Sequence, residues 1–234
     1  MKLKLYDNTK HKYKQSLDYY KDNYSEYFIE KYPNDYFSFG LDIGAVGGLF
    51  PWHINHMASN NKKTTFFGFE PNDKSFKELT NYCKSFNNTH LYKDFFGRNI
   101  SLKNLFVNNN LNINDKWFIN CDCEGDEKYI FLSQDEINIA KKACHLSFEL
   151  HPKLSGISYI DFLRILNDNF SITHKIIRTF HCDINNVGAN DNSSFIIVEK
   201  DTYKENIKKY IEYFHKNPKL GHFWSPYHNI TFIN

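Results

Sequence analysis

The sequence predicts an α/β fold in which a mostly parallel sheet carries helices on both faces. From residue 37 onward, short apolar runs of strand length alternate with segments of helical periodicity. This alternation is typical of parallel strands joined by crossover helices. The first run ends in Asp42 and a glycine-rich turn, and two later runs end in acids at Glu70 and Asp122. Ligands of such sheets bind outside the carboxyl ends of the strands, so these residues also predict where the site lies.

The individual elements follow from the same patterns. Apolar runs bounded by Gly, Pro, Asn or Asp predict strands at residues 37–43, 64–70, 90–93, 117–122, 145–150, 173–178 and 194–199. Apolar side chains at helical spacing predict helices at about residues 50–59, 72–86, 102–106, 157–167 and 203–215, with helical turns up to residue 143. The loop at 183–193 is rich in Asn and Gly, which favours an antiparallel hairpin of the last two strands at one edge of the sheet. The aromatic tail, residues 217–234, is expected to be irregular.

The chain divides into two parts. Residues 1–36 place Tyr and Leu side chains at helical spacing and close at Pro33 and Asn34, which predicts an N-terminal helical extension. Residues 37–234 are expected to form one α/β domain, because a chain of 234 residues has the size of a single domain with additions.

Composition excludes several classes of partner. Net charge is only +2 and the basic residues are scattered among acids, so no nucleic-acid partner is predicted. No apolar run approaches the roughly 20 residues of a membrane span, and the N-terminus has no secretory segment. Five cysteines form no regular framework, which favours a reducing, cytoplasmic location.

The glycine turn indicates a cationic ligand. Its pattern, Gly44-x-x-Gly47-Gly48, does not match the dinucleotide fingerprint, and no phosphate-binding Gly-Lys-Ser/Thr motif is present. Asp42 directly before the turn would repel a phosphate and attract a positive charge. S-adenosylmethionine carries a sulfonium, an amino group and no phosphate, so it is the predicted cofactor.

Two further acids suit the rest of such a cofactor. Glu70 ends the second strand, where nucleotide-binding sheets place the acid that accepts hydrogen bonds from ribose hydroxyls. Asp94 follows the third strand and could accept a hydrogen bond from an adenine amino group. A structural role for Asp94 in a turn or at a helix start is an equal alternative.

Candidate catalytic groups follow the fourth and fifth strands. Strand alternation puts Asn120, Asp122 and Glu124 on one side, and either acid could serve as general base. His151 is a second candidate base, and with Glu149 it could move a proton or bind a metal. No metal site is assigned, and the sequence neither requires nor excludes a divalent metal. The neighbouring acids at positions 126 and 127 are expected to complement a helix dipole.

The chain resembles the FkbM family of S-adenosylmethionine-dependent methyltransferases. The resemblance spans about residues 38–200 and rests on four segments in order, at residues 41–45, 69–71, 122–127 and 148–151. It implies a Rossmann-like, doubly wound sheet of seven strands and O-methylation of a hydroxyl on a sugar, a glycan or a small natural product. By this resemblance Asp42 and Gly44 line the methionine end, Glu70 holds the ribose, and Asp122 and Glu124 lie beside the transferred methyl group. The full set of predicted cofactor-binding residues is Asp42, Gly44, Ala45, Gly47, Glu70, Pro71, Asp94 and Asp122, and the candidate catalytic residues are Asp122, Glu124 and His151.

The chain departs from the family pattern at two places. Val46 and Gly47 stand where the family usually has Asn and Ile, and Asn120 stands where it usually has Lys. Loss of that cation would alter the protonation of the nearby acids. A catalytically inactive S-adenosylmethionine-binding protein is therefore an alternative to the enzyme. A nicotinamide-dependent oxidoreductase is disfavoured by the mismatched glycine pattern, and the oligomeric state is left open.

Overall fold

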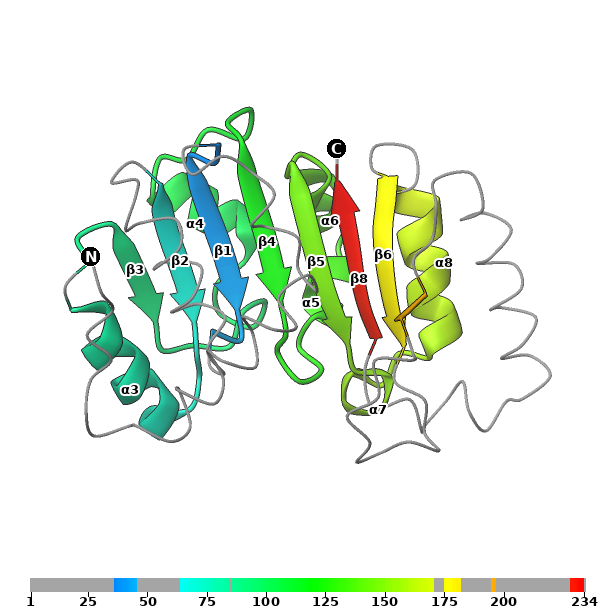
Figure 1. The fold of residues 1–234 in the computed structure, drawn as a ribbon, viewed down its shortest axis with the longest axis horizontal. Helices are drawn as coiled ribbons and strands as arrows, with labels where there is room; N and C mark the ends of the chain where they lie inside the picture. Colours follow the sequence, from blue (N-terminus) through cyan, green and yellow to red (C-terminus); the bar gives the residue numbers. More distant parts are fainter. Residues whose placement is uncertain are drawn as a thin grey trace.

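The computed structural model describes residues 36–45, 64–84, 86–170, 175–181, 195–196 and 228–233. Within these ranges the chain forms one eight-stranded sheet in the order β3-β2-β1-β4-β5-β8-β6-β7 (Figure 1). The strands are β1 (Phe39–Ile43), β2 (Thr65–Phe69), β3 (Thr89–Tyr92), β4 (Trp117–Cys121), β5 (His145–Leu150), β6 (Lys175–His181), β7 (Phe195–Ile196) and β8 (His228–Ile233).

Five adjacent strands are parallel, as the sequence predicts. β1 pairs with β2 on one side and with β4 on the other, β3 pairs with the far side of β2, and β5 pairs with the far side of β4. Their carboxyl ends therefore share one edge, which is the lower edge in Figure 1. In this register Asp42 lies beside Gly68 of β2 and Asn120 of β4.

The prediction of an irregular tail is wrong, because the tail contains β8. This strand lies antiparallel between β5 and β6. Ile230, Thr231, Phe232 and Ile233 are β-branched or aromatic and suit a strand, but the run is too short to be recognised without its neighbours. The sheet thus has eight strands where seven were expected. The predicted antiparallel pairing at one edge is confirmed for β6 and β7.

Helices cover both faces of the sheet. The described helices are α3 (Asp73–Cys83), α4 (Leu102–Asn108), α5 (Lys128–Phe131), α6 (Gln134–Ala140), α7 (Pro152–Ser155) and α8 (Tyr159–Phe170). On one face, Leu79 and Cys83 of α3 pack with Phe66 and Phe118. On the other face, apolar side chains of α4, α5, α6 and α8 join one larger core cluster.

Two acid or amide side chains fix helix starts. Asn72 accepts hydrogen bonds at Oδ1 from the N–H groups of Lys74 and Ser75, which caps α3. Buried Glu136 of α6 accepts from the N–H groups of Leu102 at 2.6 Å and Lys103 at 3.3 Å, which ties α4 to α6. Both contacts satisfy N–H groups that lack partners within their own helix.

Several predictions lie outside the described residues. They are the N-terminal extension, the helix at 50–59, the loop at 183–193 and the helix at 203–215. Within the described part of the chain, no helix is both long and apolar enough to cross a membrane.

Candidate active site at the carboxyl edge of the sheet

Gly44 lies where the ends of β1 and β4 come into close contact. Its φ is +85°, and a Cβ placed there would lie 1.6 Å from the carbonyl oxygen of Asp122. Both the backbone angle and the space admit only glycine. The N–H groups of Gly44 and Ala45 donate to the carbonyl oxygen of Phe69, at 3.0 and 2.9 Å. The turn after β1 is therefore held against the ends of both neighbouring strands.

Asp42 is buried in β1, and Asn120 of β4 holds it. Asn120 Nδ2 donates to Asp42 Oδ1 at 2.8 Å. The amide Oδ1 of Asn120 is itself buried and has no hydrogen-bond partner among the described residues. A neutral amide thus occupies the position where the family resemblance implies a lysine, and it orients the carboxylate without neutralising its charge.

Glu70 is a second buried acid, directly after β2. Its Oε1 accepts a hydrogen bond from the N–H of Asn72 at 2.8 Å. Burial raises the pKa of Glu70, and the Asn72 hydrogen bond opposes that rise. Pro71 lies in the short link between β2 and α3. Because β1 and β2 are neighbours, Asp42 and Glu70 come from adjacent strands.

Asp94 follows β3 and makes the contacts of a turn residue. Its Oδ1 accepts from the N–H of Phe95 and from Asn99 Nδ2, both at 2.7 Å. These contacts agree with the structural alternative for this acid, and its predicted role toward adenine stays a prediction.

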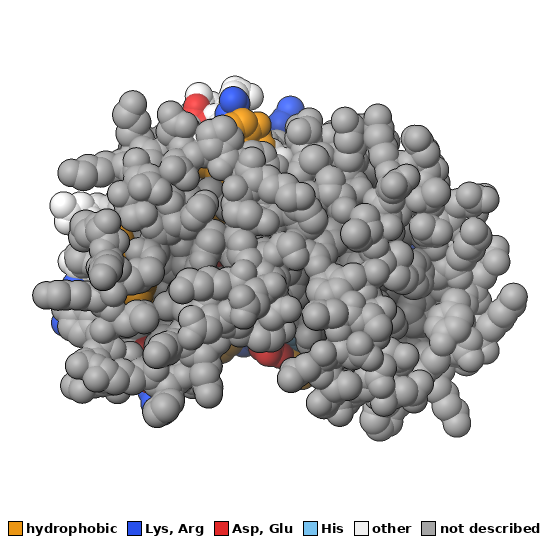
Figure 2. Space-filling model, viewed as in Figure 1, with side chains coloured by type: hydrophobic (Ala, Val, Ile, Leu, Met, Phe, Trp, Pro, Cys, Tyr) orange, Lys and Arg blue, Asp and Glu red, His pale blue; other side chains and the backbone are white. Residues whose placement is uncertain are grey.

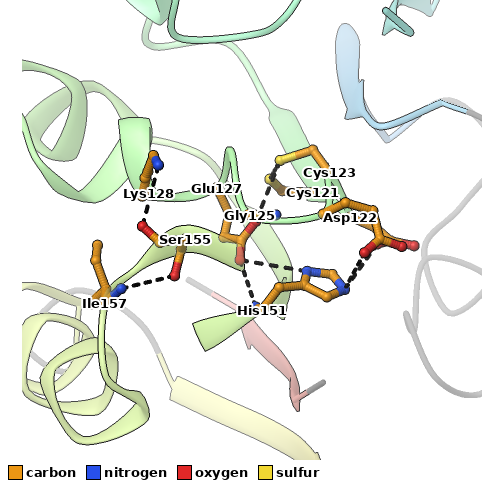
Figure 3. A network of polar contacts seen from close by, with 10 residues as sticks. Cys121, Asp122, Cys123, Gly125, Glu127, Lys128, His151, Ser155 and Ile157 are labelled. Carbon is orange, nitrogen blue, oxygen red and sulfur yellow. Dashed lines mark hydrogen bonds and ion pairs between the residues drawn. The ribbon is translucent and has the colours of Figure 1, made fainter. Parts of the chain in front are cut away.

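His151 lies close to the other two candidate catalytic residues, Asp122 and Glu124. Figure 3 shows its imidazole facing Asp122. Its Nε2 lies 3.8 Å from Asp122 Oδ1 and 3.6 Å from Glu124 Oε2. The exposed fraction of the side chain is 6% for His151, 28% for Asp122 and 75% for Glu124. The site thus has a buried imidazole at its base and carboxylates at its mouth. The three side chains lie close together, although Asp122 and Glu124 follow β4 and His151 follows β5.

Glu127 is a functional candidate, although its sequence pattern predicts only a contribution to a helix dipole. It is fully buried, and its carboxylate accepts hydrogen bonds from the N–H of His151 at 2.6 Å and of Gly125 at 2.7 Å. Its Oε1 also lies 3.5 Å from His151 Nδ1. Glu127 does stand at the start of α5, as its N-cap residue, but its carboxylate makes no cap hydrogen bond there and instead accepts from the backbone of the site. The sequence contains a signal for this role, since Glu127 is the last residue of the Asp-x-Glu-Gly-x-Glu pattern at residues 122–127.

Its neighbour Asp126 also has another partner, since Asp126 Oδ1 accepts from Arg98 Nη2 at 2.9 Å. The backbone conformation at Gly125 permits the contacts of Asp126 and Glu127. Gly125 has φ +107°, and a Cβ there would lie 2.7 Å from the backbone of Leu154. The segment after β4 is therefore packed closely on α7.

Cys121 and Cys123 lie behind this acidic segment. Their sulfur atoms are 3.5 Å apart, and burial raises the pKa of both thiols. Neither cysteine belongs to the described group of possible metal ligands, which consists of Asp122, Glu124 and His151. Both residues act as neutral packing groups.

Some predicted residues are not placed. Gly47 lies outside the described residues, as do His53 and His56, and the side chain of Glu149 is not described.

Figure 2 shows acidic side chains at the lower margin of the molecule, the side on which the parallel strands end in Figure 1.

The chain is similar to known proteins in fold only. No protein-family model and no curated protein matches the chain. The solved StiE O-MT structure, residues 942–1257, is similar with a TM-score of 0.51 at 6% identity, over 97% of this chain and 78% of that chain. Precorrin-6y C5,15-methyltransferase from Geobacter metallireducens GS-15 gives a TM-score of 0.45 at 13% identity, over 93% and 88% of the two chains.

N-methyltransferase NodS from Bradyrhizobium japonicum WM9 gives a TM-score of 0.46 at 7% identity, over 96% and 98% of the two chains. The fold of this chain is therefore that of the StiE O-MT structure. These three solved structures are methyltransferases by name, and membership of the FkbM family stays a prediction.

Proposed function

We propose that the chain is an S-adenosylmethionine-dependent methyltransferase that methylates a hydroxyl on a sugar, a glycan or a small natural product. One observation carries the proposal. Two buried acids, Asp42 within β1 and Glu70 directly after the neighbouring parallel strand β2, lie near the Gly44 turn, in a fold shared with the StiE O-MT structure. A ligand with one positive and one hydroxyl-bearing end is complementary to two carboxylates in this arrangement.

Asp42 and Asn120 suit the methionine end of the cofactor. The carboxylate of Asp42 attracts the sulfonium and ammonium charges, and the buried Oδ1 of Asn120, which has no hydrogen-bond partner among the described residues, is an acceptor for the ammonium hydrogens. Glu70 suits the ribose, because a carboxylate accepts hydrogen bonds from two vicinal hydroxyls. Bound hydroxyls would stabilise the ionised form of Glu70 and lower the pKa that burial raises.

The reaction is an in-line displacement. The substrate oxygen attacks the methyl carbon, the carbon–sulfur bond breaks, and the sulfonium becomes a neutral thioether. The hydroxyl proton leaves to the group formed by Asp122, Glu124 and His151. Alignment of the reacting atoms can supply roughly 7–11 kcal/mol, and general-base assistance about 10²–10⁴-fold in rate. Support for an oxygen acceptor comes from this base-rich group and from the FkbM resemblance.

Calorimetry of the full chain with S-adenosylmethionine and S-adenosylhomocysteine tests the cofactor site. Asp42→Asn and Glu70→Gln should each weaken binding by about 10- to 150-fold, the equivalent of one charge-assisted hydrogen bond of about 1.5–3 kcal/mol. Asp135→Asn, an exposed acid on α6, is the matched control and should bind as the wild type does. Unchanged affinity in both site variants would exclude this cofactor site.

Methyl transfer is tested separately with radiolabelled donor and a panel of glycans and hydroxylated natural products. A second candidate, a protein that binds the cofactor without transferring methyl, is favoured by Asn120, which replaces the lysine implied by the FkbM resemblance. Tight cofactor binding with no transfer to any acceptor, and a gain of transfer in Asn120→Lys, would support the second candidate.

A further inference from the structure

We propose that Asp122, Glu124 and His151 bind one divalent transition-metal ion such as Mn²⁺. Each residue offers one ligand atom, and these atoms all lie within 4.8 Å of one another. The group mixes two carboxylates with an imidazole, a donor set of oxygen and nitrogen that suits first-row divalent metals. Asp122 and Glu124 follow β4 and His151 follows β5, so the fold itself assembles the three ligands.

The distances favour a shared cation over direct hydrogen bonds. His151 Nε2 lies 3.6 Å from Glu124 Oε2 and 3.8 Å from Asp122 Oδ1, whereas N–H···O hydrogen bonds fall at about 2.7–3.2 Å. Two ligands about 2.1 Å from one ion lie roughly 3.0 Å apart in an octahedral site and roughly 3.4 Å apart in a tetrahedral one, so these side chains would close by a few tenths of an ångström around an ion. Two carboxylates at this separation from one imidazole nitrogen concentrate negative charge, which a divalent cation relieves.

Glu127 supplies a second, independent observation. Its fully buried carboxylate lies 3.5 Å from His151 Nδ1, on the side of the imidazole opposite Nε2 (Figure 3). A carboxylate in this position favours the proton on Nδ1 and leaves the Nε2 lone pair for a metal. The hydrogen bond from the His151 N–H to Glu127 Oε1 holds the backbone of the same residue. The ligand is thus oriented before any ion arrives.

The exposures leave room for further ligands. His151 is buried, but the Glu124 side chain is 75% exposed and that of Asp122 is 28% exposed. Water or a substrate oxygen can therefore complete the coordination from the open side.

The role of the ion rests on the proposed function, although the site itself does not. With the ion bound, Asp122, Glu124 and His151 would serve as ligands in place of proton acceptors. A substrate hydroxyl held by the ion would have a lowered pKa and would give its proton to solvent before it attacks the methyl group. The oxygen–carbon bond forms and the sulfur–carbon bond breaks. In this arrangement His151 is a ligand and not the general base.

The test is titration of Mn²⁺ into the chelator-treated full chain without cofactor, followed by calorimetry and by electron paramagnetic resonance. We expect one site per chain, with binding weakened at least 10-fold in Glu124→Gln and in Asp122→Asn. Glu124→Gln is the decisive variant, because its exposed side chain can change without disturbing the core. Asp135→Asn, an exposed acid of α6 outside the group of ligands, is the matched control. Binding that none of the site substitutions changes would mean an adventitious ion only.

A spectroscopic signature identifies the nitrogen ligand. Bound Mn²⁺ should show coupling to one imidazole nitrogen, and this coupling should vanish in His151→Gln. Its absence in the wild type would overturn the site. Binding of S-adenosylhomocysteine in the presence of chelator is measured in parallel. If the wild type binds S-adenosylhomocysteine but not Mn²⁺, only this inference is rejected. If the wild type binds Mn²⁺ but not S-adenosylhomocysteine, only the proposed function is rejected.

Discussion

Glu127 and His151 form a buried pair, in which the carboxylate accepts a 2.6 Å hydrogen bond from the His151 N–H and lies 3.5 Å from His151 Nδ1. The pair connects the segment after β4 to the segment after β5. One acid therefore fixes both the backbone and the side chain of the histidine that faces Asp122 and Glu124. Positioning of this kind determines which imidazole nitrogen faces the open side of the site.

Glu127→Gln should lower the free energy of unfolding by about 1–3 kcal/mol. The substitution turns one acceptor oxygen into a donor, so a buried N–H of His151 or Gly125 would face another N–H. Urea unfolding measures the change. Asp126→Asn alters only the partner of Arg98 and is the neighbouring comparison. Equal stability of the two variants would contradict the role given to Glu127.

Gly44→Ala should be destabilising and should abolish cofactor binding. The residue has φ +85°, and its Cβ would overlap the Asp122 carbonyl oxygen, so the ends of β1 and β4 would have to separate. Gly156→Ala is a matched control with φ +74° and no atom within 4 Å of its Cβ. Gly156→Ala should lower the free energy of unfolding only through its positive φ, by about 1 kcal/mol. Thermal unfolding that shifts equally in both variants would show that the close contact is unimportant.

Glu70 should make stability depend on pH. Burial raises its pKa above the ordinary value of 4.5, so the folded state binds more protons than the unfolded state in the range just above that value. Stability contributed by Glu70 is therefore present below its unfolded pKa and declines as pH rises toward its folded pKa. Urea unfolding of the wild type and Glu70→Gln across this range should show the decline in the wild type alone.

The sequence predicted the parallel half of the sheet and the edge that carries the site. Strand-length apolar runs ending in Asp42, Glu70 and Asp122 contain that information locally, because parallel strands place their carboxyl ends together. The β8 strand could not be predicted in the same way. Its pairing with β5 and β6 joins segments far apart in sequence, and its own pattern is too short to stand alone.

The site was predicted in part for a similar reason. Asp122, Glu124 and His151 were recognisable as candidates, and the structure brings them together. The role of Glu127 was missed, because an acid before a short helix has the same local pattern whether it faces solvent or a buried histidine. Asn120 is the converse case. Its departure from the family pattern was visible, but its hydrogen bond to Asp42 appears only when β1 and β4 are paired.

Glu136→Ala should lower the free energy of unfolding by about 1–3 kcal/mol without changing cofactor affinity. The carboxylate of Glu136 is buried and accepts from the N–H groups of Leu102 and Lys103 at the start of α4, so its removal leaves buried donors without partners. Urea unfolding measures the loss, and hydrogen exchange should show faster opening of α4 at its first turn. The adjacent, exposed Asp135→Asn should leave both quantities unchanged. If Glu136→Ala weakened S-adenosylhomocysteine binding as strongly as Asp42→Asn, the anchor of α4 would have to communicate with the carboxyl edge, which would contradict a purely structural role for Glu136.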